Sequence, residues 1–312
     1  MTDAALGEAE SGPTAHLRLL AVHAHPDDET IATGGTMAKY VAAGAHVTLV
    51  TCTLGEEGEV LVPELAYLAA GESDKLGQHR ITELDEAMRI LGVTDHRFLG
   101  GAGRWRDSGM MGLETNDRPD CFWRADLLEA ATELVTVIRE IRPQVILTYD
   151  SFGSYGHPDH IQAHRVAMYA AELAPIESFR PDIGQPWDVS KIYWTTLPKS
   201  VIQQGIDALI AAGKSGFFGT DSVEDVPMVI EDKYVTAIVD AVDFEPRKMA
   251  ALAAHATQVE PDGPFFEMAR TIGPGAMGSE YYILVKGTKG SKSLDAQGRE
   301  TDIFDGIDTP TG

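Results

Sequence analysis

The chain has 312 residues, of which 44% are hydrophobic and 23% are charged, a composition typical of a globular protein with a sizeable core. Its 48 acidic and 25 basic residues give a formal net charge of −23, which argues against a nucleic-acid partner because phosphate contacts need clustered Lys and Arg. No apolar run approaches the roughly 18 residues of a membrane span, so we expect no membrane partner. A small-molecule substrate is the expected partner, and the sequence gives no indication of oligomeric state.

The beginning of the chain predicts one strand, helix, strand unit. Residues 1–17 are polar, lack the pattern of a secretory signal and are expected to form a disordered extension. The apolar run Leu19–His23 predicts a buried strand, and Ile31–Ala43 predicts a helix that ends at Gly44. A second strand, rich in β-branched residues, is predicted over His46–Thr53. Such units are typical of parallel sheets with right-handed crossovers.

The alternation of strands and helices then continues. Helices are predicted over Arg80–Leu91 and Leu127–Ile141, and strands over Arg97–Gly100 and Val145–Asp150. The pattern predicts an α/β fold with a Rossmann-like, doubly wound and mainly parallel sheet over residues 18–185. In such sheets ligands bind beyond the carboxyl ends of the strands.

The second part of the chain carries weaker signals. Strands are predicted over Lys191–Leu197, Tyr234–Asp240 and Tyr281–Gly287, with a helix over Pro246–Ala256 before the last of them. We interpret residues 186–289 as a smaller C-terminal α/β region that completes the substrate cleft. Residues 290–312 are polar and rich in glycine, and are expected to be a mobile tail. The two cysteines, Cys52 and Cys121, suggest reduced thiols and a cytoplasmic location.

Titratable side chains gather directly after two of the predicted strands. The first segment is "HAHPDDE" (His23–Glu29), and the second is "SYGHPDH" (Ser154–His160). A catalytic zinc ion takes three protein ligands and keeps one position open. His25, Asp28 and His160 can supply those ligands.

A second carboxylate beside the ligands suits an acid–base role. Asp27 is adjacent to Asp28 and is the candidate general base for a water molecule activated by the metal. Pro26 and Pro158 stiffen the two segments.

Simpler readings exist for the same residues. Asp28 or Thr30 can serve as the N-cap of the helix over Ile31–Ala43, and a lone histidine in a strand such as His23 is more often a hydrogen-bonded core residue than a ligand. A dinucleotide-binding oxidoreductase is the alternative from another class. No G-x-G-x-x-G follows the first strand, however, and the acids found there would repel a pyrophosphate.

The two segments together resemble the zinc-dependent N-acetylglucosaminyl de-N-acetylase (LmbE-like) family. Within that family, "TCTLGEEGEV" (Thr51–Val60), "LGGAGRWRDSGM" (Leu99–Met110) and "ALAAHATQV" (Ala251–Val259) are similar to the actinobacterial branch that acts in mycothiol biosynthesis. The resemblance covers most of residues 18–290, with a looser match over residues 172–245.

The resemblance implies a role for each matching position. It implies one zinc ion per chain, with iron(II) as an alternative because two histidines and one aspartate suit both metals. The implied zinc ligands are His25, Asp28 and His160, the implied catalytic residues are Asp27, Tyr155, His157 and Asp159, and Arg80 and Asp107 are implied to bind sugar and inositol hydroxyls.

The roles and the substrate follow from the same resemblance. Tyr155 would polarise the acetyl carbonyl, His157 would steady the oxyanion or protonate the leaving amine, and Asp159 would orient His157. Without the resemblance, Tyr155 reads as a loop aromatic, Arg80 as a solvated helix residue and Asp107 as a partner of nearby arginines. The implied activity is hydrolysis of the acetamide of N-acetylglucosaminyl-inositol to glucosaminyl-inositol and acetate, and the alternative is a mycothiol S-conjugate amidase with the same metal site.

Overall fold

The computed structural model describes residues 16–226 and 228–307, so the expected disordered extension, residues 1–17, falls outside the described residues apart from its last two. The described residues form one sheet of eight strands in the order β3-β2-β1-β4-β5-β8-β7, with β6 beside β5. The strands are β1 (Arg18–His23), β2 (His46–Thr51), β3 (Asp95–Phe98), β4 (Val145–Thr148), β5 (Lys191–Pro198), β6 (Val229–Ile230), β7 (Ala237–Asp240) and β8 (Ser279–Lys286).

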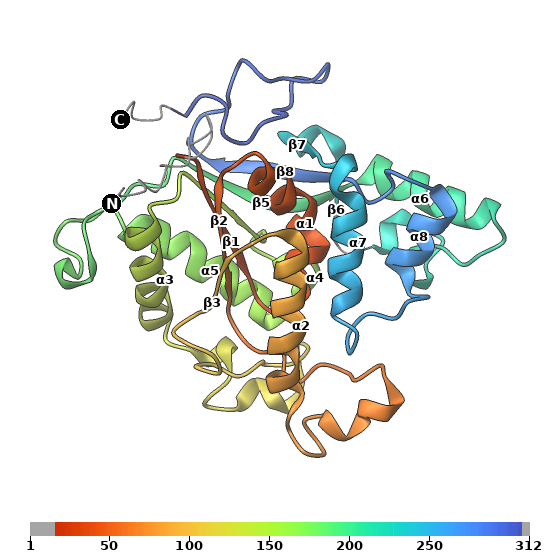
Figure 1. Cartoon of the computed structure of the whole chain (residues 1–312), viewed down its shortest axis with the longest axis horizontal. Helices are drawn as coiled ribbons and strands as arrows, with labels where there is room; N and C mark the ends of the chain where they lie inside the picture. Colours follow the sequence, from red (N-terminus) through yellow and green to blue (C-terminus); the bar gives the residue numbers. More distant parts are fainter. Residues whose placement is uncertain (1–15, 227, 308–312) are drawn as a thin grey trace, which may run out of the picture.

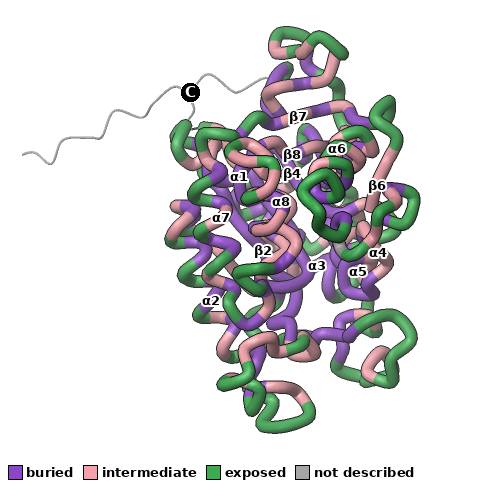
Figure 2. Tube along the Cα trace, turned by 90° about the vertical axis from the view of Figure 1, so that its right-hand side faces the viewer, coloured by how far each residue is buried: buried purple, intermediate pink, exposed green. Residues whose placement is uncertain are grey.

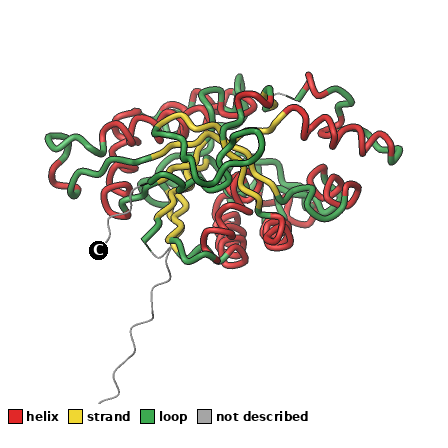
Figure 3. Tube along the Cα trace, turned by 90° about the horizontal axis from the view of Figure 1, so that it is seen from above, coloured by secondary structure: helices red, strands yellow, loops and turns green. Residues whose placement is uncertain are grey.

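Helices connect most of these strands and cover both faces of the sheet (Figures 1 and 3). Short 3-10 turns lie in the loops between them. The α-helices are α1 (Asp28–Ala42), α2 (Leu76–Leu91), α3 (Leu127–Ile141), α4 (Gly153–Gly156), α5 (Pro158–Leu173), α6 (Lys199–Ala211), α7 (Glu245–Ala254) and α8 (Pro264–Ile272).

The direction of the strands confirms the predicted α/β fold. β1 pairs in parallel with both β2 and β4, and the parallel pairing extends to β3 on one side and to β5 on the other. Only β8 runs antiparallel among the described strands, between β5 and β7. The strand order reverses between β1 and β4, which is the switch point of a doubly wound sheet, and this point fixes where a ligand crevice forms.

The core has two layers because side chains alternate along each strand. On β1, Leu20 and Val22 belong to the apolar layer beneath α3 and α5, whereas Leu19 and Ala21 belong to the layer beneath α1, α2 and α7. All four side chains are fully buried, and the central strands are the most buried part of the chain (Figure 2). This two-sided burial explains why β1 is an uninterrupted apolar run.

The elements predicted in the first part of the chain are confirmed, with shifts of a few residues at their ends, and α3 has the predicted bounds. The helices α5, α6 and α8 were not predicted. α5 begins with the last three residues of the second segment, Pro158–His160, and its buried residues are mainly alanines and polar groups, so its sequence lacks a clear apolar stripe. α6 and α8 pack around a separate small core that includes Ile206 and Met268.

The expectation of a mobile tail over residues 290–312 is wrong for residues 290–307, and residues 308–312 lie outside the described part. Ile303 is fully buried in the layer beneath α1, and Phe304 packs against Tyr40 with ring centroids 5.1 Å apart. Glu300, also fully buried, accepts a hydrogen bond of 2.6 Å from Lys191. The polar composition of this segment therefore gave no sign of the buried ion pair between Glu300 and Lys191 or of the apolar packing of Ile303 and Phe304.

The sheet continues across the expected domain boundary at residue 185. β4 lies before this boundary and β5 after it, and the two strands pair in parallel. Among the described residues no helix combines the length and the apolar character needed to cross a membrane. The division into a catalytic region and a smaller C-terminal region stays a prediction.

The packing of the last segment yields a first prediction. Ile303→Ala should lower the free energy of unfolding by about 2–5 kcal/mol, because it removes a fully buried side chain from the core. Leu294→Ala, in the same segment but 42% exposed, should change it by less than about 0.5 kcal/mol. Denaturant titration of both variants measures the difference, and equally small effects would mean that the segment does not pack as described.

Candidate metal centre

The first segment (His23–Glu29) and the second segment (Ser154–His160) meet at the switch point of the sheet. The first segment follows β1 and leads into α1, and the second follows β4 and leads into α5. β1 and β4 are neighbours in parallel register, so their carboxyl ends open on the same edge of the sheet. The topology therefore brings together side chains that are more than 130 positions apart.

Of the three predicted metal ligands, His25 and His160 both approach the same carboxylate oxygen of the third, Asp28. Oδ2 of Asp28 lies 3.2 Å from Nδ1 of His25 and 3.3 Å from Nε2 of His160. Donor atoms that each lie about 2.0–2.1 Å from a zinc ion in a tetrahedral site are themselves about 3.3 Å apart. These two separations fit that geometry. Two other groups have ligand atoms that all lie within 4.8 Å of one another, namely His25, His157 and His160, and His25, Asp107 and Asp159.

The opposite nitrogen of His25 faces two further carboxylates. Nε2 lies 3.2 Å from Oδ2 of Asp159 and 3.4 Å from Oδ1 of Asp107. Each of these acids is at most 4% exposed. A carboxylate behind a metal-binding imidazole fixes its tautomer and orientation, so this contact is the one expected if Nδ1 is the ligand atom.

This geometry corrects the expected role of Asp159. Its carboxylate contacts His25 and accepts hydrogen bonds from the backbone and hydroxyl of Ser108, and it does not contact the ring of His157. The link between Asp159 and His157 runs through the backbone, where the Asp159 N–H donates to Nδ1 of His157 over 3.1 Å. The carboxylate of Asp159 is therefore placed to orient His25 and not His157, whose Nδ1 contacts the backbone at the start of α5, and the catalytic roles of both residues stay predictions.

His157 and Tyr155 line the remaining side of the cluster. The ring centroids of His157 and His25 are 4.6 Å apart, and Nε2 of His157 lies 4.0 Å from Oδ1 of Asp107. The hydroxyl of Tyr155 lies 3.3 Å from Nε2 of His160. Ser154 has a φ of 64°, a strained value for serine that turns the chain just before Tyr155.

Arg80 and Asp107 are more buried than a simple substrate-binding role predicts. Arg80 is 3% exposed and donates to the carbonyl oxygens of Gly55 and Pro26 and, over 3.1 Å, to Oδ2 of Asp27. Asp107 accepts the N–H of Gly109 over 2.8 Å and does not pair with Arg106, which binds Glu57 and Asp74 instead. The expected contacts of both residues with substrate hydroxyls stay predictions.

The N-terminus of α1 does not have the side-chain cap that the sequence predicts. α1 begins at Asp28, and the residue before it, Asp27, makes no side-chain cap hydrogen bond. Thr30 does not cap the helix either, because its hydroxyl donates to Glu29 over 2.6 Å. Asp27 has a φ of 126° and a ψ of −35°, a conformation that costs a non-glycine residue about 1–3 kcal/mol. The acids at this turn are therefore arranged for contacts other than helix capping.

Burial and neighbouring charges separate the pKa values of the two adjacent acids. Burial raises the pKa of Asp27 to about 6, although the positive charge of Arg80 opposes this shift. Burial acts in the same direction on Asp28, but His160 and His25 outweigh it and hold the pKa of Asp28 well below its usual value. Asp28 is therefore the permanent anion of the pair, and Asp27 is the one able to exchange a proton near neutral pH.

The pKa values of the histidines are separated as well. Burial lowers the pKa of His25, but Asp107, Asp159 and Asp28 together raise it well above its usual value. Burial, reinforced by the charges of His25 and His160, lowers the pKa of His157 to about 3. A neutral His157 therefore faces the cluster with Nε2, next to a histidine that is surrounded by acids.

Sequence reasoning missed one supporting residue, Tyr149, and correctly treated His23 as a core residue. The ring of Tyr149 stacks on His160 with centroids 4.3 Å apart, and its hydroxyl accepts the N–H of Ala24 over 2.9 Å. His23 contacts the Tyr149 hydroxyl over 3.2 Å and the Thr33 hydroxyl over 3.0 Å. The only signal for Tyr149 was its place at the end of a predicted strand.

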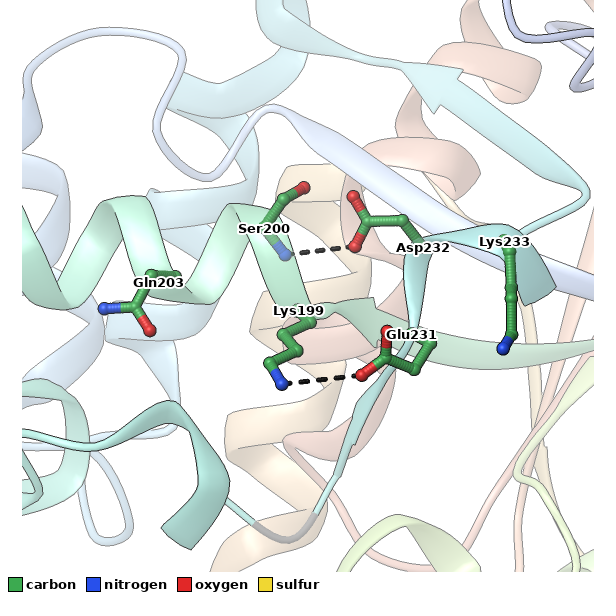
Figure 4. A pocket seen from close by; sticks show the side chains of 6 residues that line it. All are labelled: Lys199, Ser200, Gln203, Glu231, Asp232 and Lys233. Atoms are coloured by element: carbon green, nitrogen blue, oxygen red, sulfur yellow. Dashed lines mark hydrogen bonds and ion pairs between the residues drawn. The ribbon is translucent and has the colours of Figure 1, made fainter.

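A pocket of about 380 Å³ lies elsewhere, where α6 begins. Its lining residues are Lys199, Ser200, Gln203, Glu231, Asp232 and Lys233 (Figure 4). The Ser200 N–H donates to Asp232 over 3.0 Å, and Lys199 pairs with Glu231 over 3.4 Å, so both acids of the pocket already have partners. The pocket contains none of the histidines of the metal centre.

Comparison with known proteins identifies the family of the chain. The family described as PIG-L, GlcNAc-PI de-N-acetylase, matches residues 20–171. A 1D-myo-inositol 2-acetamido-2-deoxy-alpha-D-glucopyranoside deacetylase of Geodermatophilus obscurus is 57% identical over 291 residues, which cover 93% of this chain and 98% of that protein. The chain belongs to the PIG-L family. A protein of the same name from Streptomyces scabiei is 55% identical, over 93% of this chain and 90% of its own length.

Solved structures support the fold of this PIG-L family member. The N,N'-diacetylchitobiose deacetylase from Pyrococcus horikoshii superimposes with a TM-score of 0.57 and 21% sequence identity, over 86% of this chain and 83% of that chain. A conserved protein from Thermus thermophilus superimposes with a TM-score of 0.55 and 21% identity, over 90% of this chain and 100% of that one. At these identities the likeness concerns the fold alone.

The contact behind His25 generates a second prediction. Asp159→Asn should weaken Zn²⁺ binding roughly 10- to 100-fold, because a neutral amide holds the Nε2–H of His25 less well than a carboxylate. Competition with a chromophoric chelator measures the affinity. Asp182→Asn, which alters an exposed acid paired with Arg180, is the matched control and should leave the affinity unchanged. Equal affinities for the two variants would mean that Asp159 does not support a ligand.

Proposed function

We propose that the protein is a zinc-dependent deacetylase acting on 1D-myo-inositol 2-acetamido-2-deoxy-α-D-glucopyranoside. It hydrolyses the acetamide to release acetate and glucosaminyl-inositol, a step of mycothiol biosynthesis. The observation that carries this proposal is the name shared by relatives that are 54–57% identical over at least 93% of the chain. The separated pKa values of Asp27 and Asp28 at the switch point support it.

His25, Asp28 and His160 are the ligands that we propose for the metal. Two imidazole nitrogens and one carboxylate oxygen match the donor set of catalytic zinc, and they suit iron(II) as well. Among the described residues, Nδ1 of His160 is buried and has no hydrogen-bond partner. The other ring nitrogen, Nε2, lies 3.3 Å from Asp28, so Nε2 is the nitrogen that we propose as the ligand. A bound divalent metal supplies a Lewis acid that polarises a carbonyl oxygen and lowers the pKa of water.

Asp27 is the general base in this proposal. Its carboxylate is 18% exposed, whereas the side chain of Arg80, which holds it in place, is 3% exposed. It can therefore reach a water molecule while its orientation stays fixed. Asp27 removes a proton from the attacking water and can return one to the departing amine.

Tyr155 and His157 act on the other side of the acetamide. The Tyr155 hydroxyl, held beside His160, can donate a hydrogen bond to the acetyl oxygen as negative charge develops there. A neutral His157, whose Nδ1 accepts the Asp159 N–H, can donate a hydrogen bond from Nε2–H to the same oxygen, whereas delivery of a proton to the leaving nitrogen would require its charged form. Asp107 contacts both His25 and His157, and it would keep the two rings in register.

A cytoplasmic location fits the proposed biosynthetic role. Cys52 and Cys121 are both buried as free thiols, which suits a reducing compartment.

Acetate release with and without metal tests the proposed activity directly. The purified protein should release acetate from the proposed substrate, lose that activity after chelation, and regain it when Zn²⁺ or Fe²⁺ is added back. A mycothiol S-conjugate should be cleaved more slowly. Faster cleavage of the conjugate would favour the amidase alternative, and full activity without metal would refute the metal dependence.

The division of roles between the adjacent acids generates a further prediction. Asp27→Asn should lower kcat by roughly 10²- to 10⁴-fold, the usual contribution of a general base, while the bound zinc stays near one per chain. Asp28→Asn should lower both zinc content and kcat. Zinc is measured by atomic emission on the same samples. Loss of zinc from Asp27→Asn would show that Asp27 is a ligand and not a base.

A further inference from the structure

A buried histidine from the C-terminal region reaches the first segment of the metal centre. His255, at the end of α7, is fully buried, and its Nε2 lies 2.9 Å from Oε1 of Glu29. Glu29 is fully buried as well and lies in the first turn of α1. A contact between residues 226 positions apart is thus made directly beside the proposed base.

Glu29 connects this histidine to the backbone of Asp27. Its second oxygen, Oε2, accepts the N–H of Asp27 over 2.9 Å, and Oε1 also accepts the hydroxyl of Thr30 over 2.6 Å. Three donors therefore converge on one carboxylate, which satisfies them only as an ionised, acceptor-only group. His255 keeps that carboxylate charged and pointing toward Asp27.

The backbone of Asp27 needs such support because it is strained. Its φ of 126° is unfavourable for a residue with a side chain. This conformation aims the Asp27 carboxylate at Arg80 while the next residue, Asp28, turns toward His25 and His160. Without the hydrogen bond to Glu29, the turn could relax and the two adjacent carboxylates would lose their separate directions.

The segment that carries His255 is itself tightly anchored. Thr257 donates both its N–H and its hydroxyl to Glu83 on α2, each over 2.8 Å. The carbonyl oxygen of Thr257 accepts the N–H of Leu61 over 2.9 Å, and the side-chain amide of Gln258 donates at the surface to the carbonyl oxygen of Glu59 over 3.0 Å. His255 is therefore a fixed point against which the turn at Asp27 is held.

We propose that Glu29 and His255 are positioning residues that hold the strained backbone of Asp27 and thereby aim its carboxylate for general-base catalysis. The proposal rests on the proposed function for the identity of the reaction. The hydrogen-bond chain from His255 through Glu29 to the Asp27 N–H can be tested separately.

Two disruptive variants and one conservative variant test the chain. Glu29→Gln and His255→Leu should each lower kcat for acetate release roughly 10- to 100-fold, with KM and bound zinc unchanged, since the ligands are intact but the base is misaimed. His255→Gln should recover most of the kcat, because its side-chain N–H can take the place of Nε2–H. In crystal structures of the two disruptive variants, φ of Asp27 should leave the region near 126°.

Glu300→Gln is the matched control for loss of a buried carboxylate. Glu300 is fully buried and accepts hydrogen bonds from Lys191 and Tyr193, each over 2.6 Å, at the strand ends opposite the metal centre. It should lower the melting temperature and leave kcat unchanged.

Three results would overturn the proposal. They are a Glu29→Gln variant with normal kcat and an unchanged Asp27 backbone, a loss of kcat that follows a loss of zinc, and a His255→Gln variant no better than His255→Leu. If the unmodified protein releases no acetate, the proposed function fails, and the Asp27 backbone in the variant structures still decides whether the positioning chain exists.

Discussion

The metal centre depends on the position of one carboxylate, that of Asp28, between the rings of His25 and His160. Both imidazoles are buried, and Asp28 stays ionised because the two rings together outweigh the effect of its own burial. The contact joins the segment after β1 to the segment after β4, so it can form only where these strands lie side by side. The fold serves the site by bringing these two strand ends together.

Three buried charged residues, two acids and one arginine, contact the residues of the site from behind. Asp159 and Asp107 stand behind His25, and Arg80 stands beside Asp27. Each of the three is almost fully buried, so removing one leaves a charged group without its partner in a region of low dielectric. Arg80 and Asp107 can still contribute to substrate binding, but their burial makes orientation of the site their first effect.

The sequence was sufficient for the parts of the structure that depend on local patterns. β1, α3 and β4 follow from apolar runs and their flanking residues, and the proximity of His25, Asp28 and His160 follows from their places after neighbouring strands, whereas their role as metal ligands stays a prediction. Contacts that depend on tertiary packing could not be read in this way. The segment around Ile303 has a polar sequence, and only the folded structure shows that Glu300 pairs with Lys191. The side chain of Asp159 contacts His25, although His157 lies only two residues before Asp159 in the sequence.

Three consecutive acids after β1 would repel one another in an isolated peptide, and each one here has a different basic side chain as its partner. Arg80 faces Asp27, the imidazoles of His25 and His160 face Asp28, and His255 faces Glu29. Asp28 and Glu29 also occupy the first turn of α1, where the helix dipole favours negative charge. In a dinucleotide-binding sheet this helix end attracts a pyrophosphate. Here the chain supplies the anions itself, and this converts the same position of the fold from an anion site into one suited to a metal cation.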